Sequence, residues 1–98
     1  MVDMILGTTF RNWLSGLKDR RAAMRIHARI DLIGLGNFGD AKFVRGGIFE
    51  LQVDYGPGYR VYFIRRELAT VVLLAGGVKS TQDADIARAI AIAREWSD

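Results

Sequence analysis

The chain has 98 residues, is 50% hydrophobic and carries a formal net charge of +3. This length and composition fit a single domain at residues 1–98 with a modest core, and they exclude disordered and collagen-like architectures. There is no cysteine, which excludes disulfides and thiolate metal sites, and no run of about 18 apolar residues that could span a membrane. No signal peptide is visible, so we expect a cytoplasmic protein, whose positive charge allows an anionic partner such as RNA.

The first part of the chain predicts one strand and two helices. Residues 2–6 form a short apolar run, which indicates an edge strand. The next segment has apolar residues at helical spacing, and Thr8 or Thr9 is the expected cap of this helix. These residues are Phe10, Trp13, Leu14 and Leu17. A second helix, capped by Asp19, should end near Gly34. Its expected buried stripe is Ala23, Ile26, Ile30 and Ile33.

The second predicted helix also carries a row of basic residues. Arg21, Arg25 and Arg29 follow one another at four-residue spacing. Such a row is typical of a solvated helix face, although nucleic acid could also bind it. His27 is the only histidine. It has no second imidazole or thiolate with which to bind a metal and no obvious acid–base partner, so we expect no metal site and no cofactor.

The stretch at residues 50–63 has two alternating runs on either side of Gly56-Pro57-Gly58. This pattern predicts a β-hairpin. Because side chains alternate between faces along a strand, one face should meet helices with its apolar groups. These are Leu51, Val53, Tyr55, Tyr59, Val61 and Phe63. The other face collects Glu50, Gln52, Asp54, Arg60 and Tyr62. It is either a solvated sheet surface or a platform for a site.

Two further strands and a helix complete the predicted order. Residues 41–45 should start the sheet before the hairpin, and residues 70–75 should form a buried strand that Gly76-Gly77 ends. Ser80 and Asp83 are spaced as in a capping box and indicate the start of a last helix. The order of one strand, two helices, three antiparallel strands and one helix predicts an α+β sandwich, in which an antiparallel sheet packs against a two-helix hairpin.

Motifs along almost the whole chain carry a resemblance to a known family. They are Trp13-Leu14, Leu17-Lys18-Asp19-Arg20-Arg21-Ala22, Ala28-Arg29-Ile30-Asp31, Gly36-Asn37-Phe38-Gly39-Asp40, Glu50-Leu51, Asp54-Tyr55-Gly56-Pro57-Gly58-Tyr59-Arg60-Val61-Tyr62-Phe63 and Gly76-Gly77-x-Lys79-Ser80-Thr81-Gln82-x-x-Asp85-Ile86. Together they resemble the RelE/ParE toxin superfamily, in its HigB-like branch of addiction-module killer proteins. The resemblance implies a β-α-α-β-β-β-α toxin sandwich with a C-terminal helix.

The resemblance also implies a function and a site. Such toxins of type II toxin–antitoxin modules typically cleave messenger RNA without a metal, often on the ribosome, and are silenced by an antitoxin that is frequently a helix-turn-helix protein. Carried over by position, the candidate catalytic residues are Lys42, Arg60, Tyr62 and Lys79. Arg60 would bind the scissile phosphate and Tyr62 would position the nucleotide, while the two lysines would stabilise charge or assist proton transfer. The expected RNA-binding residues are Arg45, Lys79 and Ser80.

The chain departs from the family pattern mainly by replacing polar residues. Gln52 stands where the family usually has Arg, which removes a cation beside Arg60 and predicts weakened activity. The added apolar groups predict a partner interface. Its residues are Ile5, Phe43, Phe49, Val78 and Ile92. The alternative function is an engineered binding or self-assembling protein on this toxin scaffold, with a designed partner or itself as partner and little nuclease activity. A gyrase-poisoning toxin and a nucleic-acid-binding module are further alternatives.

Overall fold

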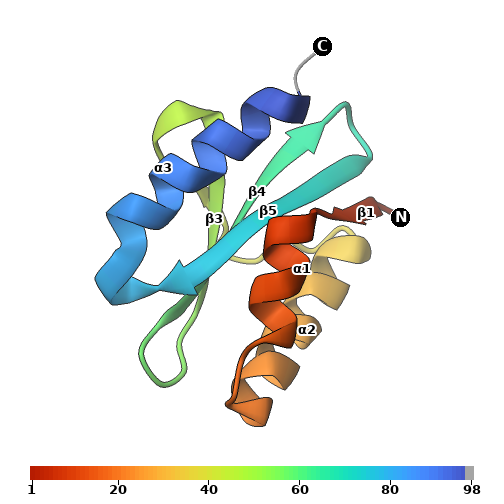
Figure 1. Cartoon of the computed structure of the whole chain (residues 1–98). Coiled ribbons are helices and arrows are strands. Elements are labelled where there is room, and N and C mark those ends of the chain that lie inside the picture. The colour runs from red at the N-terminus through yellow and green to blue at the C-terminus, as the bar shows by residue number, and fades with distance from the viewer. Residues whose placement is uncertain (97–98) are drawn as a thin grey trace.

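The computed structural model describes residues 1–96, and Figure 1 shows a sheet with α1 and α2 on one side and α3 on the other. The helices and strands are β1 (Asp3–Leu6), α1 (Thr8–Ser15), α2 (Arg20–Gly34), β2 (Lys42–Phe43), β3 (Phe49–Val53), β4 (Tyr59–Arg66), β5 (Thr70–Val78) and α3 (Gln82–Ala93). The α+β class is confirmed. The predicted order has three strands after the two helices where the structure has four, and β2 lies within residues 41–45, which were expected to start the sheet.

The five strands lie in the order β1-β5-β4-β3-β2. The pairs β2 with β3, β3 with β4 and β4 with β5 are antiparallel. β1 is an edge strand, as predicted, but it runs parallel to β5, with Asp3 opposite Thr70 and Leu6 opposite Leu73. The sheet is therefore mixed, and the prediction of an antiparallel sheet is wrong for β1. The direction of this strand depends on pairing with the far end of the chain, which leaves no local pattern in the sequence.

Helices α1 and α2 cover one face of the sheet. Asp19 caps α2 as predicted, because its carboxylate accepts hydrogen bonds from the backbone N–H groups of Arg21 and Ala22 at 3.1 and 3.2 Å. The predicted threonine cap of α1 is wrong, since the capping position is Gly7 and no side chain bonds there. The core between these helices and the sheet contains Phe10, Leu14, Ala22, Ile26, Ile30, Ile33, Leu51, Val53, Tyr59, Val61, Phe63, Val71 and Leu73. The prediction that the apolar hairpin face meets helices is confirmed.

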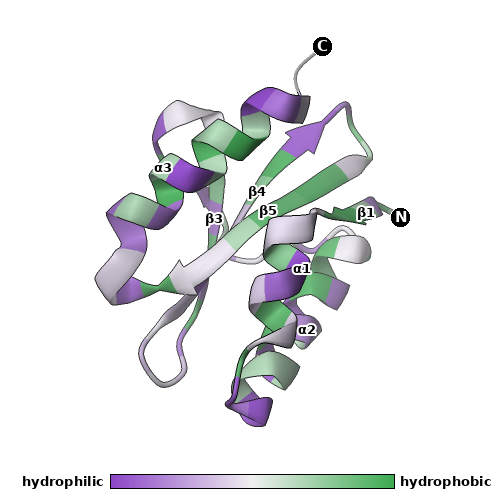
Figure 2. Ribbon diagram, viewed as in Figure 1, coloured by the Kyte–Doolittle hydropathy of each residue, from purple (hydrophilic) through white to green (hydrophobic). Residues whose placement is uncertain are grey.

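Helix α3 covers the other face and encloses a second core. Its buried residues are Ile48, Tyr62, Val72, Leu74, Ala75, Ile86 and Ala89. Figure 2 shows the hydrophobic colour along β5, the strand that both helical layers cover. The polar face of the hairpin therefore lies under a helix, and its interpretation as a solvated sheet surface is wrong.

Strand β5 continues through Gly76 and Gly77 to Val78, so the prediction that these glycines end it is wrong. A Cβ atom at Gly76 would overlap the Trp13 ring of α1, and one at Gly77 would overlap the Asp85 carboxylate of α3. Each glycine lets one helix approach the strand, on opposite faces of the sheet. The predicted cap at Ser80 is also wrong, because α3 begins later, after a short 3-10 turn.

Candidate functional site

A polar cluster lies between the central hairpin and α3. Its four ionisable members are Glu50, Arg60, Tyr62 and Asp85, of which 0%, 8%, 0% and 6% is exposed, respectively. Glu50 lies directly opposite Tyr62 in the pairing of β3 with β4, as Gln52 does opposite Arg60. Directly opposed residues project to the same face. The hairpin alone therefore brings together the side chains of Glu50, Gln52, Arg60 and Tyr62. Asp85 reaches the cluster from α3 by packing over Gly77.

Glu50 is at the centre of the cluster. Its Oε2 accepts a hydrogen bond from Gln82 Nε2 at 2.7 Å and lies 3.5 Å from Arg60 Nε. Its Oε1 accepts a hydrogen bond from Gln52 Nε2 at 3.3 Å. A buried carboxylate is costly unless it is both paired and hydrogen-bonded. Groups from β3, β4 and α3 supply these contacts, so the site is complete only when α3 is docked on the sheet.

The Arg60 guanidinium joins Glu50 to the end of the hairpin. Its Nη1 donates to the Gly58 carbonyl at 3.2 Å, and the backbone N–H of Lys79 donates to the same carbonyl at 2.8 Å. A Cβ atom at Gly58 would lie 3.4 Å from both Arg60 Nη1 and Lys79 Cβ. The backbone of Lys79, in the turn that follows β5, therefore lies beside the Arg60 guanidinium at Gly58.

The Tyr62 hydroxyl is buried beside two carboxylates. Burial raises the pKa of this phenol, the charges of Glu50 and Asp85 raise it further, and the charge of Arg60 opposes the shift. Within residues 1–96, neither the Tyr62 hydroxyl nor Arg60 Nε has a hydrogen-bond partner of standard geometry. The phenol therefore stays protonated at neutral pH. Because Tyr62 is fully buried, it does not present its ring to a nucleotide in this conformation.

Sequence reasoning did not single out Glu50 or Asp85 as site residues. The Thr81 hydroxyl lies 2.5 Å from Asp85 Oδ2, which fixes this carboxylate above Gly77. Both acidic residues belong to the motifs that carry the family resemblance, and this was the available signal. Two carboxylates and one guanidinium are buried together, so the charge of Arg60 is offset within the protein.

The remaining predicted RNA-contacting residues lie at the margin of the cluster. Lys42 lies opposite Glu50 in the pairing of β2 with β3, and is therefore on the cluster's face at an exposed position. Lys79 and Ser80 are exposed at the turn that follows β5. Arg45 is bound by Asp83, with Nη1 3.2 Å from the carboxylate Oδ1. Arg60 and Tyr62 thus belong to the cluster and Lys79 lies at its margin, while Arg45 is paired with Asp83.

The five residues of the predicted partner interface do not form one surface. Phe49 and Val78 pack against the core under α1 and α2, whereas Ile5 and Ile92 pack against the core under α3. Phe43, on the edge strand β2, is 66% exposed and stacks on Phe49 with ring centroids 4.0 Å apart. Only Phe43 of these five residues has an exposed side chain, because the helices on both faces partly cover the other four.

Within the described part of the chain, no three His, Asp or Glu side chains are grouped so that they could hold a metal ion. Over the same residues, every helix is too short or too polar to cross a membrane.

The fold and the cluster define a small α+β protein with helices on both faces of its sheet and an ionic network under one of them. The chain is similar to an uncharacterized protein of Haemophilus influenzae, with 54% identity over 87 residues, which span 89% of this chain and 88% of that protein. The chain belongs to the family of that protein. No protein-family model matches the chain.

Proposed function

We propose that the chain is the toxin of a type II toxin–antitoxin module and a metal-independent endoribonuclease of the cytoplasm. Its partners would be messenger RNA on the ribosome and a helix-turn-helix antitoxin. The observation that carries this proposal is that Arg60 Nη1 and the backbone N–H of Lys79 both donate to the Gly58 carbonyl, so the exposed Lys79 starts beside the Arg60 guanidinium. A guanidinium with a lysine side chain next to it can bind an RNA phosphate and stabilise the charge that develops on it.

Attack by a ribose 2′-hydroxyl needs a negatively charged phosphorane to be stabilised and the leaving oxygen to be protonated. In this proposal Arg60 and Lys79 stabilise the phosphorane, and Lys42 contacts an adjacent phosphate from the edge of the same sheet face. Glu50 holds Arg60 through Nε, so it orients the guanidinium. Tyr62 supports this arrangement from below, because its buried ring packs in the core under α3.

The carboxylate of Glu50 also reduces the positive charge that Arg60 offers to a phosphate. Gln52, which lies opposite Arg60, adds a hydrogen bond to Glu50 and no charge. We therefore propose that the activity is weaker than that of a toxin with a second arginine at this place. Gln52→Arg should raise the rate of RNA cleavage, because a second guanidinium would lie beside Arg60.

The sharpest test uses Lys79, because it is exposed and its substitution leaves the ionic network intact. Expression without an antitoxin should arrest growth, and Lys79→Ala should relieve the arrest and reduce cleavage of ribosome-bound messenger RNA by about 100-fold. Lys18→Ala, which removes the same charge from the exposed connection of α1 to α2, is the matched control. Thermal unfolding would verify that both variants fold. The proposal fails if the unmodified chain leaves growth and RNA intact, or if both variants arrest growth equally.

A second candidate is a binding or self-assembling protein, engineered or natural, with little nuclease activity. The observation that favours it is the 66% exposure of Phe43 on β2, the edge strand of the sheet. Exposed edge strands can pair with another chain, and an aromatic group beside them adds apolar contact. Light scattering should then show an oligomer that Phe43→Ser dissociates, together with normal growth. A monomer would exclude self-assembly.

A further inference from the structure

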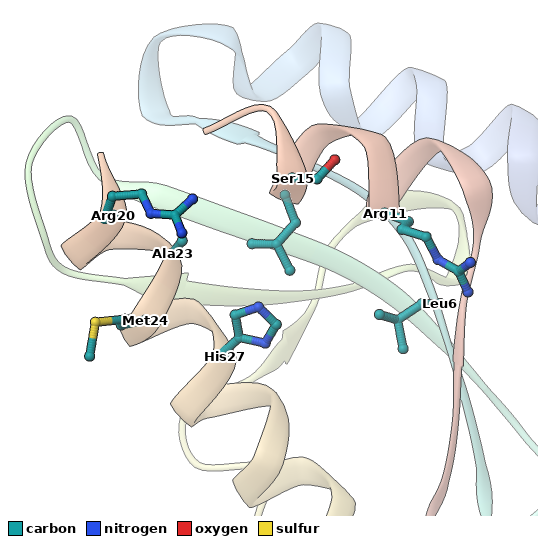
Figure 3. A pocket seen from close by; sticks show the side chains of 8 residues that line it. Leu6, Arg11, Ser15, Arg20, Ala23, Met24 and His27 are labelled. Carbon is teal, nitrogen blue, oxygen red and sulfur yellow. The ribbon is translucent and has the colours of Figure 1, made fainter. Parts of the chain in front are cut away.

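A groove between α1 and α2 lies on the opposite side of the sheet from the polar cluster. It has a volume of about 380 Å³ and is lined by Leu6, Arg11, Leu14, Ser15, Arg20, Ala23, Met24 and His27. Figure 3 shows Arg11 and Ser15 extending from α1, and Arg20 and His27 from α2. The groove thus lies between two helices, on the face of the sheet opposite to the Glu50 side chain.

The groove combines an apolar floor with a basic rim. Leu6, Leu14 and Ala23 supply apolar surface, and Met24 stands beside them with 70% of its side chain exposed. No carboxylate lines the groove. Among the described residues, the guanidinium groups of Arg11 and Arg20 have no hydrogen-bond or ion-pair partner, so their charges remain available to another molecule.

Two shallower hollows extend this surface along α2. The first shares Met24 with the groove and includes Arg21, and both hollows are lined by Arg25 and Ala28. Arg25 lies over the Tyr55 ring, 4.6 Å from its centroid. Farther along α2, Arg29 binds Asp40 at 2.7 Å. The basic row seen in the sequence therefore divides, because Arg25 and Arg29 contact other parts of the fold whereas Arg21, at the end nearer the groove, lines a hollow.

We propose that this groove docks an acidic, amphipathic segment of another protein. The apolar side chains of the segment would cover Leu14 and Ala23, and its carboxylates would pair with Arg11 and Arg20. Helix-in-groove recognition uses this combination, and an exposed methionine adapts to the shape of a bound partner. An RNA backbone would use the basic rim but leave the apolar floor uncovered. This inference goes beyond the proposed function, because it holds whether or not the chain cleaves RNA.

The test is a titration of the isotope-labelled chain with a synthetic helical peptide that has leucines on one face and glutamates elsewhere, followed by NMR. We expect saturable shifts at the amides of residues 6, 11, 14, 23, 24 and 27, and binding that weakens with added salt. Arg20→Glu and Met24→Glu should each weaken binding at least about tenfold, because they place a carboxylate at the rim or floor of the groove. Arg88→Glu, at an exposed position of α3, is the matched control and should bind like the unmodified chain.

The proposal is overturned if no shifts map to the groove, or if a scrambled peptide of the same composition binds equally well. It is also overturned if Arg88→Glu weakens binding as much as Arg20→Glu, or if a single-stranded RNA oligonucleotide binds this groove more tightly than the peptide. None of these results depends on growth arrest or RNA cleavage. A failure here is therefore distinguishable from a failure of the proposed nuclease.

Discussion

The two faces of the sheet are covered by helices but differ in what they bury. Under α1 and α2 the core is built from apolar side chains. The buried charged residues of the described chain, Glu50, Arg60 and Asp85, all lie on the face that α3 covers. Apolar burial is favourable over many arrangements, whereas a buried charge needs specific partners. The first face therefore stabilises the fold, and the second imposes a particular geometry on one group of side chains.

This difference shows where function is to be sought. An apolar layer under α3 would hold the helix equally well, because replacing a buried ion pair by well-packed apolar groups is often neutral or stabilising. The charges under α3 hold the Arg60 guanidinium between Glu50 and the Gly58 carbonyl, a position that apolar packing would not specify. Substitutions on each face test this difference.

The largest effect is expected when Glu50 is replaced by alanine. This leaves the Arg60 guanidinium buried without its carboxylate, and the free energy of unfolding should fall by about 3–5 kcal/mol. Chemical denaturation measures the loss. A free energy of unfolding within about 1 kcal/mol of that of the unmodified chain would mean that the face under α3 does not depend on this ion pair.

A double variant provides the control for this prediction. Glu50→Leu combined with Arg60→Met removes both charges and should recover most of the lost stability, because no unpaired charge of this ion pair remains and only the amides of Gln52 and Gln82 lose an acceptor. Ile26→Ala, on the apolar face, should cost about 2–5 kcal/mol through the cavity that it leaves. Substitution of Arg60 should not restore that loss, since the two positions lie on different sides of the sheet.

The adjacent glycines of β5 should each be sensitive to one face only. Gly76→Ala forces the new methyl group against Trp13, and Gly77→Ala forces it against Asp85. Each change should destabilise the fold by about 1–3 kcal/mol, as overpacking typically does. Double-mutant cycles should show coupling of Gly76→Ala with Trp13→Leu and of Gly77→Ala with Asp85→Ala, but not the crossed pairs. Coupling in the crossed pairs would mean that the two faces are not independent.

Local features of the fold could be predicted from the sequence, and features that depend on distant pairing could not. The hairpin, its apolar face and the cap at Asp19 each depend on residues close together in the chain. The parallel direction of β1 and the passage of β5 through Gly77 depend on contacts with remote elements. A glycine pair in the sequence indicates a turn and close packing equally well, and only the docked helices distinguish the two.

The candidate site was predictable to the extent that one strand pair defines it. Arg60 and Tyr62 share a face because they alternate along β4, and the family resemblance added Lys79. The partnership of Glu50 with Gln82 depends on how α3 docks, and so does the approach of Asp85. The alternation along the strands therefore predicts that these polar groups share one face, but it does not predict that α3 covers them.

A pH-dependent effect is expected at Tyr62. Its pKa is raised above the usual 10.0 in the folded state, first by burial and then by the charge of Glu50. Below about pH 10 the Tyr62 hydroxyl is protonated in both the folded and the unfolded protein, so its contribution to stability is fully present. Above it the unfolded state ionises first, so the free energy of unfolding falls by up to about 1.4 kcal/mol per pH unit. Tyr62→Phe should remove this part of the decline.

Denaturation of both proteins between about pH 8 and about pH 11 measures the difference in slope. Near neutral pH, Tyr62→Phe should change stability by no more than about 1 kcal/mol, because the hydroxyl that it removes has no hydrogen-bond partner of standard geometry within residues 1–96. Parallel declines of the two proteins above pH 10 would show that Tyr62 ionises as easily in the folded state as in the unfolded one.

The smallest effect is expected at the exposed ion pair of Arg45 with Asp83, whose side chains are 53% and 97% exposed. Arg45→Ala should lower the free energy of unfolding by about 0.2–1 kcal/mol, and added salt should abolish the difference. The loss caused by Glu50→Ala should persist in salt, because ions do not reach a buried pair. Denaturation at low and high salt measures both. A large, salt-independent cost at Arg45 would place it within the ionic network under α3, and that network would then extend from Gly58 to the outer edge of the helix.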